Sequence, residues 1–297
     1  LVDCVIQGNI RNYGTGEVRF EAPQITPEST ATKPSEVYKP GATLDRTLEY
    51  GGKTVPIYRD RPLNVFSDVD FIWTGEENEN QRRLEYLGGE FRTRYGIDVS
   101  SFQGEIDWDA VADDNIDFAM VRVGFRGTGT GSLNTDKYYE QNIRGAMRAG
   151  LETGVYFFAQ AVTVEEAIEE ADYVISLLDG LDINGPVAYD WEMHDSTYRV
   201  YGTSPEMATA CAVAFCQRIK DAGYTPMVYG GTYVTYMKYD QGALADYLSW
   251  YPEYKSEKSE KLCPTLVYHM DYWQFSSSRA VAGINGRVDM NIQFIRR

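Results

Sequence analysis

The stretch of sequence that decides the fold runs from Gly154 to Glu192 and reads GVYFFAQAVTVEEAIEEADYVISLLDGLDINGPVAYDWE. Its apolar beginning, residues 154–159, predicts a strand, and the apolar run at residues 186–191 predicts a second one. Between them, residues 163–166 (TVEE) form a capping box, which predicts the start of a helix. A strand, a helix and a strand in this order predict two parallel strands of one sheet.

The same alternation continues on both sides of this stretch. A first strand is predicted around Tyr95, and further strands are predicted at 118–123, 226–229, 247–251, 267–275 and 288–294. Helices are predicted at 136–149 and from Ser204, an N-cap followed by proline, to Gly223. About eight strands in roughly 200 residues favour a closed barrel over an open sheet. The expected fold class is therefore α/β, a TIM-like β/α barrel.

The chain changes character near residue 90. Six of its eleven prolines lie in the first 62 residues, and no sustained helical periodicity is visible there. Short strand-like runs occur at 54–58 and 69–73. We therefore expect residues 1–90 to form an extended or small β-rich region of unknown role, and residues 91–297 to form the catalytic barrel domain.

Composition excludes several classes of partner. The formal charge of −16 argues against nucleic acid and anionic membranes, and no apolar run is long enough to span a bilayer. Cys211 and Cys216 fall on one predicted helix, roughly 7.5 Å apart along its axis, which is too far for a disulfide. The chain begins with Leu1 rather than Met, which is compatible with removal of a leader.

Asp190 and Glu192 are the strongest candidates for chemistry. A strand has a side-chain period of two, so both carboxylates point to the same side, where one keeps a proton and the other its charge. Such a pair can cleave a glycosidic bond, although a charged strand end is the plain structural alternative. Asp98 follows the first predicted strand and Asp289 lies in the last, so all four acids can converge at the barrel's C-terminal face. The nearby His194 is expected at the surface.

Residues 95–297 resemble the lysozymes of glycoside hydrolase family 25. The segments that carry the resemblance, in chain order, are 96–104 with 106–108, 118–124, 154–161, 190–192, 272–275, 283–286 and 288–291. Two departures stand out: many members have histidine where Phe157 stands, and residues 247–251 match only loosely. Residues 1–90 lie outside the resemblance.

The resemblance implies a β/α barrel that hydrolyses the β-1,4 bond between N-acetylmuramic acid and N-acetylglucosamine in peptidoglycan. It implies that Glu192 is the general acid/base, that Asp190 is its anionic partner, and that Asp98 and Asp289 line the same pocket. Either the substrate's 2-acetamido group or a water molecule attacks the anomeric carbon. No cofactor and no metal are expected, and the expected location is secreted or associated with the cell envelope.

Six residues are candidates for substrate binding, because aromatic rings can stack on sugars and amides can bond their hydroxyl groups. They are Tyr229, Trp273, Gln274, Tyr156, Gln103 and Trp191. The alternative is that the rings are core residues and that the glutamines cap loops. The expected partners are peptidoglycan glycan strands, and the oligomeric state stays open.

Three other functions fit parts of the sequence. A chitinase-like enzyme could use the same acidic pair, although the longer Asp-x-x-Asp-x-Asp-x-Glu string of chitinases is absent, since residues 185–189 carry no acid. A wall-binding module without catalysis is disfavoured by the presence of all four acids. The third possibility is that residues 1–90 carry the main role by binding a partner.

Overall fold

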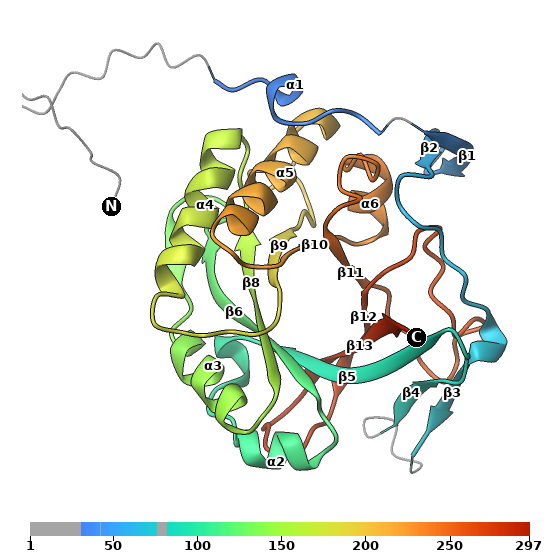
Figure 1. The fold of residues 1–297 in the computed structure, drawn as a ribbon, viewed down its shortest axis with the longest axis vertical. Coiled ribbons are helices and arrows are strands. Elements are labelled where there is room, and N and C mark those ends of the chain that lie inside the picture. The colour runs from blue at the N-terminus through green and yellow to red at the C-terminus, as the bar shows by residue number, and fades with distance from the viewer. Residues whose placement is uncertain (1–30, 42, 76–81) are drawn as a thin grey trace, which may run out of the picture. The chain divides into compact units, whose positions relative to one another are not determined.

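The computed structural model of the chain describes residues 31–41, 43–75 and 82–297. One sheet has the strand order β5-β13-β12-β11-β10-β9-β8-β6-β7, and pairing of β5 with β6 closes all of it except β7 into an eight-stranded barrel (Figure 1). The barrel strands are β5 (Phe91–Val99), β6 (Phe118–Arg126), β8 (Glu152–Ala159), β9 (Val187–Trp191), β10 (Pro226–Tyr229), β11 (Leu248–Pro252), β12 (Tyr272–Arg279) and β13 (Val288–Arg296). The predicted α/β barrel is confirmed at this level.

The last strand distinguishes this barrel from a regular parallel one. Around the barrel, each strand pairs in parallel with the next in the series β5, β6, β8, β9, β10, β11 and β12. The last strand, β13, is antiparallel to both of its neighbours, β12 and β5. Only residues 280–287 join β12 to β13. A parallel connection needs a crossover of about a dozen residues or more, so this short loop enforces the antiparallel direction. The fold is therefore a mixed barrel.

The helices follow individual barrel strands. They are α2 (Trp108–Asp113), α3 (Tyr139–Arg148), α4 (Val164–Leu177), α5 (Pro205–Asp221) and α6 (Thr232–Met237), while the short β7 (Leu133–Thr135) forms a hairpin with β6. The side chains of Thr163 and Ser204 cap α4 and α5 by accepting backbone N–H groups, as predicted. Cys211 and Cys216 on α5 are buried and free, also as predicted.

Side-chain alternation along the strands builds two separate cores. The barrel interior holds Phe118, Met120, Ala188, Met227, Tyr229, Trp250 and Tyr272. The outer core lies between strands and helices and receives the alternate residues, such as Val187, Tyr189 and Trp191 of β9. Because Ala188 faces the interior, the period of two places Asp190 there as well. The fold thus directs Asp190 into the barrel.

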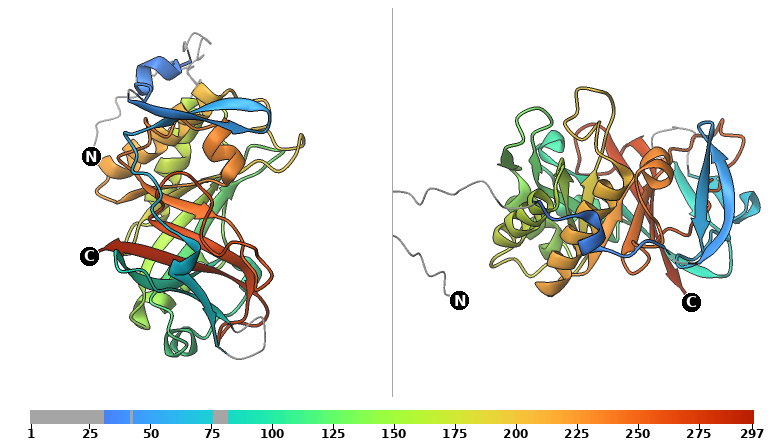
Figure 2. Two further views of the ribbon diagram at one scale, coloured as in Figure 1. Left: turned by 90° about the vertical axis from the view of Figure 1, so that its right-hand side faces the viewer. Right: turned by 90° about the horizontal axis from the view of Figure 1, so that it is seen from above.

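Residues 32–90 belong to the same compact unit as the barrel, Thr32–Arg297. They form α1 (Pro34–Val37), the hairpin β1 (Leu44–Tyr50) with β2 (Lys53–Tyr58), the 3₁₀ turn η1 (Asp68–Asp70), and the hairpin β3 (Phe71–Thr74) with β4 (Arg83–Tyr86). Figure 2 shows β1 and β2 beside α6, where the rings of Tyr50 and Tyr236 are 5.2 Å apart. Residues 1–30 of the predicted N-terminal region lie outside the described residues, and its boundary at residue 90 stays a prediction.

Arg61 anchors this segment to the barrel. The buried guanidinium donates to the carbonyl oxygens of Leu244 (3.2 Å) and Tyr247 (2.7 Å) and to Oε1 of Gln241 (3.2 Å). Arg61→Ala leaves these acceptors unsatisfied, so we expect the free energy of unfolding to fall by about 3 kcal/mol. Urea titration measures this loss. Arg148→Ala, at an exposed arginine of α3, is the control, and equal stability of the two variants would contradict the anchoring role.

Candidate active site

Four carboxyl groups meet at one end of the barrel. Asp98 lies near the end of β5, Asp190 lies near the end of β9, and Glu192 directly follows β9. Asp289 is the second residue of β13, and because β13 runs in the opposite direction its start lies where the parallel strands end. In the β5–β13 ladder Asp289 pairs directly with Asp98. The structure therefore brings together the four acids that we expected in one pocket.

Asp98 is buried and firmly held. Its Oδ2 accepts hydrogen bonds from the side-chain amides of Gln274 and Asn291, both at 2.8 Å. Burial and the nearby Asp289 carboxylate raise the pKa of Asp98 well above its ordinary value, against these two hydrogen bonds. The amides are fixed in turn, since Asn291 accepts from Trp250 Nε1 at 2.8 Å and Gln274 accepts from the hydroxyl of Tyr229 at 3.1 Å.

Asp190 lies in the barrel interior with one oxygen unused. The residue is only 6% exposed, and its Oδ1 has no hydrogen-bond partner within the described part of the chain. Burial, followed by the charges of Glu192 and Asp98, raises the pKa of Asp190 well above its ordinary value, while Arg122 opposes the shift. An unpartnered buried carboxyl oxygen is costly, so this atom is available to a ligand or a proton.

Asp289 is less enclosed than the two interior aspartates. Burial and the charge of Glu192 raise the pKa of Asp289 to about 6, although a hydrogen bond from its own backbone opposes the rise. With Asp98 and Asp190 also shifted upward, the cluster holds protons under conditions in which isolated aspartates are ionised. Adjacent acidic groups that share protons are typical of sites for acid catalysis.

Glu192 stands at the border between this cluster and an open cleft. Its backbone carbonyl accepts from Nε2 of Gln160 at 2.8 Å, and its Oε2 lies 2.8 Å from Nε2 of His194. Its side chain is 25% exposed, so Glu192 reaches solvent more freely than the buried Asp98 and Asp190 do. The expected surface position of His194 is confirmed, and its contact with Glu192 is an additional finding.

The cleft beside Glu192 has a volume of about 690 Å³ and is rich in tyrosine. Tyr201, Tyr233 and Tyr254 line it with about half of each side chain exposed, and Tyr229 forms its inner wall. The Tyr254 hydroxyl donates to Oε1 of Gln274 at 3.1 Å, which links the cleft to the amide that holds Asp98. Sequence reasoning missed Tyr201, Tyr233 and Tyr254, and the signal available was the abundance of tyrosine, 23 residues in all.

The six predicted substrate-binding residues separate into two groups. Tyr156, Tyr229 and Gln274 lie in or beside the barrel interior near the acids: Tyr156 and Tyr229 pack with Trp250, and Gln274 bonds Asp98. Burial raises the pKa of Tyr156 well above its ordinary value, and the charge of Asp98 adds to the rise.

The other three residues lie outside the barrel interior. Trp191 and Trp273 are fully buried in the outer core, where their Nε1 groups donate to the carbonyl oxygens of Ala161 and Glu253. Their neighbours on the strand face inward, so the period of two turns these rings to the other side of the sheet. Trp191 nevertheless contributes to the lining of the cleft beside Glu192. Gln103 belongs to the 3₁₀ turn η2 (Ser101–Gln103), and its Oε1 accepts from the backbone N–H of Ser100 at 2.9 Å. Gln103 therefore caps a loop, and Trp273 packs in the core. Trp191 also packs in the core but borders the cleft, so its role in substrate binding stays a prediction.

Neither a metal cluster nor a membrane helix is found in the part of the chain that the structure describes. Across residues 31–41, 43–75 and 82–297, no group of three or more histidine, cysteine, aspartate or glutamate side chains is arranged to hold an ion. Over the same ranges no helix is long and apolar enough to cross a bilayer.

His194→Gln tests the contact with Glu192. The imidazole lies 2.8 Å from Oε2 of Glu192, so it orients this carboxyl group at the edge of the cleft, and its ring also faces Tyr198. Glutamine cannot place a ring nitrogen at the same point, so we expect kcat/KM to fall about threefold in the variant, which is the effect of one lost hydrogen bond. The control is Ser196→Ala in the same exposed loop, and equal kcat/KM values of the two variants would contradict a role for the contact.

Comparison with known proteins places this geometry in a family. The profile of Glycosyl hydrolases family 25 matches residues 97–284. The autolytic lysozyme of Clostridium acetobutylicum is 26% identical over 197 residues, which cover 66% of this chain and 54% of that protein. Lysozyme M1 of Streptomyces globisporus is 27% identical over 201 residues, with 66% of each chain covered. The chain thus spans about half the length of the first relative and about two thirds of the second.

A solved structure gives the same barrel. The spore cortex lytic enzyme SleM of Clostridium perfringens superimposes with a TM-score of 0.58 at 22% identity, covering 68% of this chain and 67% of that one. At this level of identity the likeness speaks for the fold. The family profile covers well over half of the chain and spans Asp98, Asp190 and Glu192. This chain belongs to family 25 of the glycosyl hydrolases.

Proposed function

We propose that this chain hydrolyses the β-1,4 bond between N-acetylmuramic acid and N-acetylglucosamine in peptidoglycan. The observation that carries the proposal is the cluster of four carboxyl groups beside a tyrosine-lined cleft, on a barrel of family 25. Breaking a glycosidic bond needs one carboxylic acid and one carboxylate that face the same sugar. Family membership disfavours the chitinase-like alternative.

Glu192 is the general acid in this proposal. It follows β9 at the cleft edge, where its partly exposed carboxyl group can reach the oxygen of a leaving sugar. Asp98 and Asp190 are more deeply buried and are less suited to that contact. General acid catalysis needs hydrogen-bond reach to the departing oxygen.

Asp190 supplies negative charge to the transition state, and the proton that its raised pKa favours passes to another acid of the cluster. Positive charge develops at the anomeric carbon as the bond breaks, and a buried carboxylate stabilises it more strongly than an exposed one. The unpartnered Oδ1 of Asp190 needs no other group to be displaced first. Asp98 and Asp289 complete the cluster: the amides of Gln274 and Asn291 orient Asp98, and Asp289 lies beside it in the ladder.

The cleft tyrosines bind the glycan strand. Tyrosine combines an apolar face, which packs against a sugar ring, with a hydroxyl group that bonds sugar oxygens. Tyr201 comes from the loop after β9, Tyr233 from α6, and Tyr254 from the segment after β11, so three elements line one cleft. The Oε1 of Gln274 accepts from both Tyr229 and Tyr254 and couples this wall to the acids. A glycan substrate places the action of the protein at the cell wall, either secreted or associated with the envelope.

The products of digestion test the proposal. Purified peptidoglycan is incubated with the chain, the released fragments are reduced with borohydride, and their ends are identified by mass spectrometry. Reduced muramic acid at the new ends is the expected result. Reduced glucosamine ends, release from chitin alone, or wall binding without release would each overturn the proposal.

Asp289→Asn is expected to stabilise the chain at neutral pH. The pKa of Asp289 is raised to about 6 from an ordinary 3.8, so its ionisation costs folding energy as the pH rises from about 4 to 6. Asparagine removes this cost, and we expect a gain of about 1 kcal/mol at pH 7.5 and none near pH 3.5. Urea titration at both values measures it, with Asp179→Asn, at an exposed position, as control. A gain of equal size at both pH values would contradict the electrostatic origin.

A further inference from the structure

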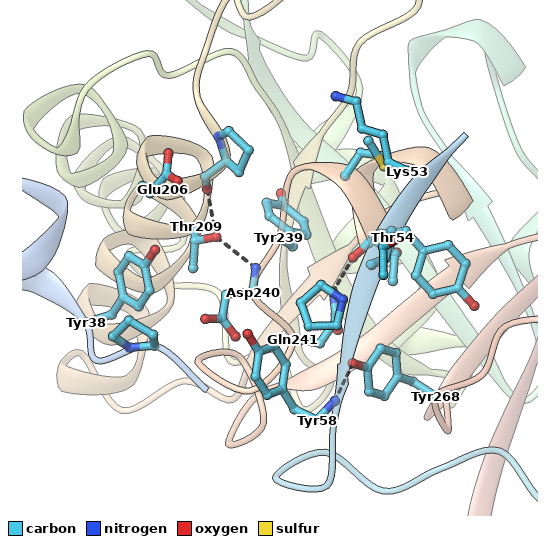
Figure 3. A pocket seen from close by; sticks show the side chains of 17 residues that line it. Tyr38, Lys53, Thr54, Tyr58, Glu206, Thr209, Tyr239, Asp240, Gln241 and Tyr268 are labelled. Atoms are coloured by element: carbon cyan, nitrogen blue, oxygen red, sulfur yellow. Dashed lines mark hydrogen bonds between the residues drawn. The ribbon is translucent and has the colours of Figure 1, made fainter. Parts of the chain in front are cut away.

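A second cavity, of about 410 Å³, lies apart from the acids (Figure 3). Residues of β2, the start of α5, α6 and the turn after α6 line it. The helix α6 divides it from the catalytic cleft: residues 232–234 line the cleft, and residues 235–237 line this cavity. Its outer wall, made by residues 38, 40, 53–56 and 58, precedes the part of the chain that the family profile matches.

Tyrosines form much of the wall: Tyr38, Tyr58, Tyr236, Tyr239 and Tyr268. The structure holds two of these in place, since the Tyr268 hydroxyl accepts from the backbone N–H of Tyr58 at 3.0 Å and the Tyr236 hydroxyl accepts from that of Val267 at 2.9 Å. The volume and the mixed lining are those of pockets that take small ligands.

Charges of opposite sign stand on opposite sides of this cavity. Figure 3 shows Glu206 on one side and Lys53 on the other. Neither side chain has a hydrogen bond or an ion pair with any residue that the structure describes. Unpaired charges that face a common cavity are available to a ligand of complementary charge.

Further charges strengthen each side. On the acidic side, burial and the charges of Asp240 and Glu206 raise the pKa of Tyr38. Near Lys53, but outside the lining of the cavity, lies Lys238, whose pKa is lowered by burial and by the charge of Lys53. The ammonium group of Lys238 donates to the carbonyl oxygen of Thr203 at 2.6 Å. The cavity is therefore anionic at one side and cationic at the other.

We propose that this cavity binds a short peptide that carries a free amino group and, at a separate point, a free carboxylate. The amino group would meet Glu206, the carboxylate would meet Lys53, and the tyrosine rings would pack along the chain between them. A neutral sugar would form no ion pair with either charge, and the acidic side would repel a phosphate. The source of the peptide rests on the proposed function: a peptidoglycan peptide that is not cross-linked carries a free amino group on its diamino acid and a carboxylate at its end. The cavity would then hold a wall peptide while the cleft holds the glycan.

Calorimetric titration of the full chain tests the inference. The probe is the tetrapeptide Ala-γ-D-Glu-Lys-D-Ala with an acetylated amino terminus. The comparison ligands are the same peptide with its lysine amino group also acetylated and both carboxyl groups amidated, and a chito-tetrasaccharide. We expect the probe to bind, and blocking of its charged groups to weaken binding about tenfold. Lys53→Gln and Glu206→Gln should each weaken it at least about threefold. The controls Lys220→Gln and Asp179→Asn lie at exposed positions outside the cavity and should leave it unchanged.

The two proposals fail separately. Absence of peptide binding, or equal binding by the charge variants and the unchanged chain, would overturn the peptide site even if muramic acid ends are released from peptidoglycan. Peptide binding that depends on Lys53 and Glu206, without any hydrolysis, would keep the site and overturn the proposed function. Thermal unfolding of each variant shows whether a loss of binding arises from a loss of fold.

Discussion

Glu192→Gln is expected to lower kcat on peptidoglycan by about a hundred- to ten-thousandfold while leaving glycan binding intact. The substitution keeps the size of the side chain and removes the proton that the leaving sugar oxygen must receive. Its cleft position, with Oε2 of Glu192 near His194 and its backbone held by Gln160, is compatible with an amide of the same shape. Release of soluble fragments measures turnover, and sedimentation with insoluble wall measures binding.

A matched exposed glutamate controls this experiment. Glu140→Gln on α3 makes the same chemical change at a residue outside the acidic cluster, whose side chain is 54% exposed. It should leave both turnover and binding unchanged. Near-normal turnover by Glu192→Gln would remove Glu192 from the role of acid, and loss of both turnover and binding would assign it to substrate binding.

The barrel was predictable because its signals are local. The capping residue Thr163, the Ser204-Pro205 helix start and the apolar runs between them mark each helix and strand without reference to the rest of the chain. The direction of β13 was harder to foresee. It follows from the short connection at residues 280–287, which joins two strands where other parts of the barrel insert a helix.

The four acids were predictable, whereas part of the binding surface was not. Strand alternation alone shows that Trp273, beside Gln274, faces the other side of the sheet. Tyr201, Tyr233 and Tyr254 instead lie outside the barrel strands. Tertiary packing decides where such side chains meet, and one sequence carries no periodic signal for it.

Asp190→Asn is expected to reduce kcat by about a hundred- to a thousandfold, for a different reason from Glu192→Gln. Asparagine fits the same volume, but it offers no negative charge to the positive charge that develops at the anomeric carbon. The buried position of Asp190 makes that charge effective, because little water screens it. Glu192 is the acid among the residues that line the cleft, and Asp190 lies beside it in the barrel interior.

The leaving group of the substrate separates the two roles. An aryl glycoside with an acidic phenol departs without needing a proton, so it should restore much of the activity of Glu192→Gln. The same substrate should not rescue Asp190→Asn, since its sugar still develops positive charge. The measurement compares kcat for the aryl glycoside and for natural glycan in both variants, with Glu140→Gln as control. Rescue of Asp190→Asn but not of Glu192→Gln would reverse the assignment, because the group whose loss a good leaving group compensates is the one that donates the proton.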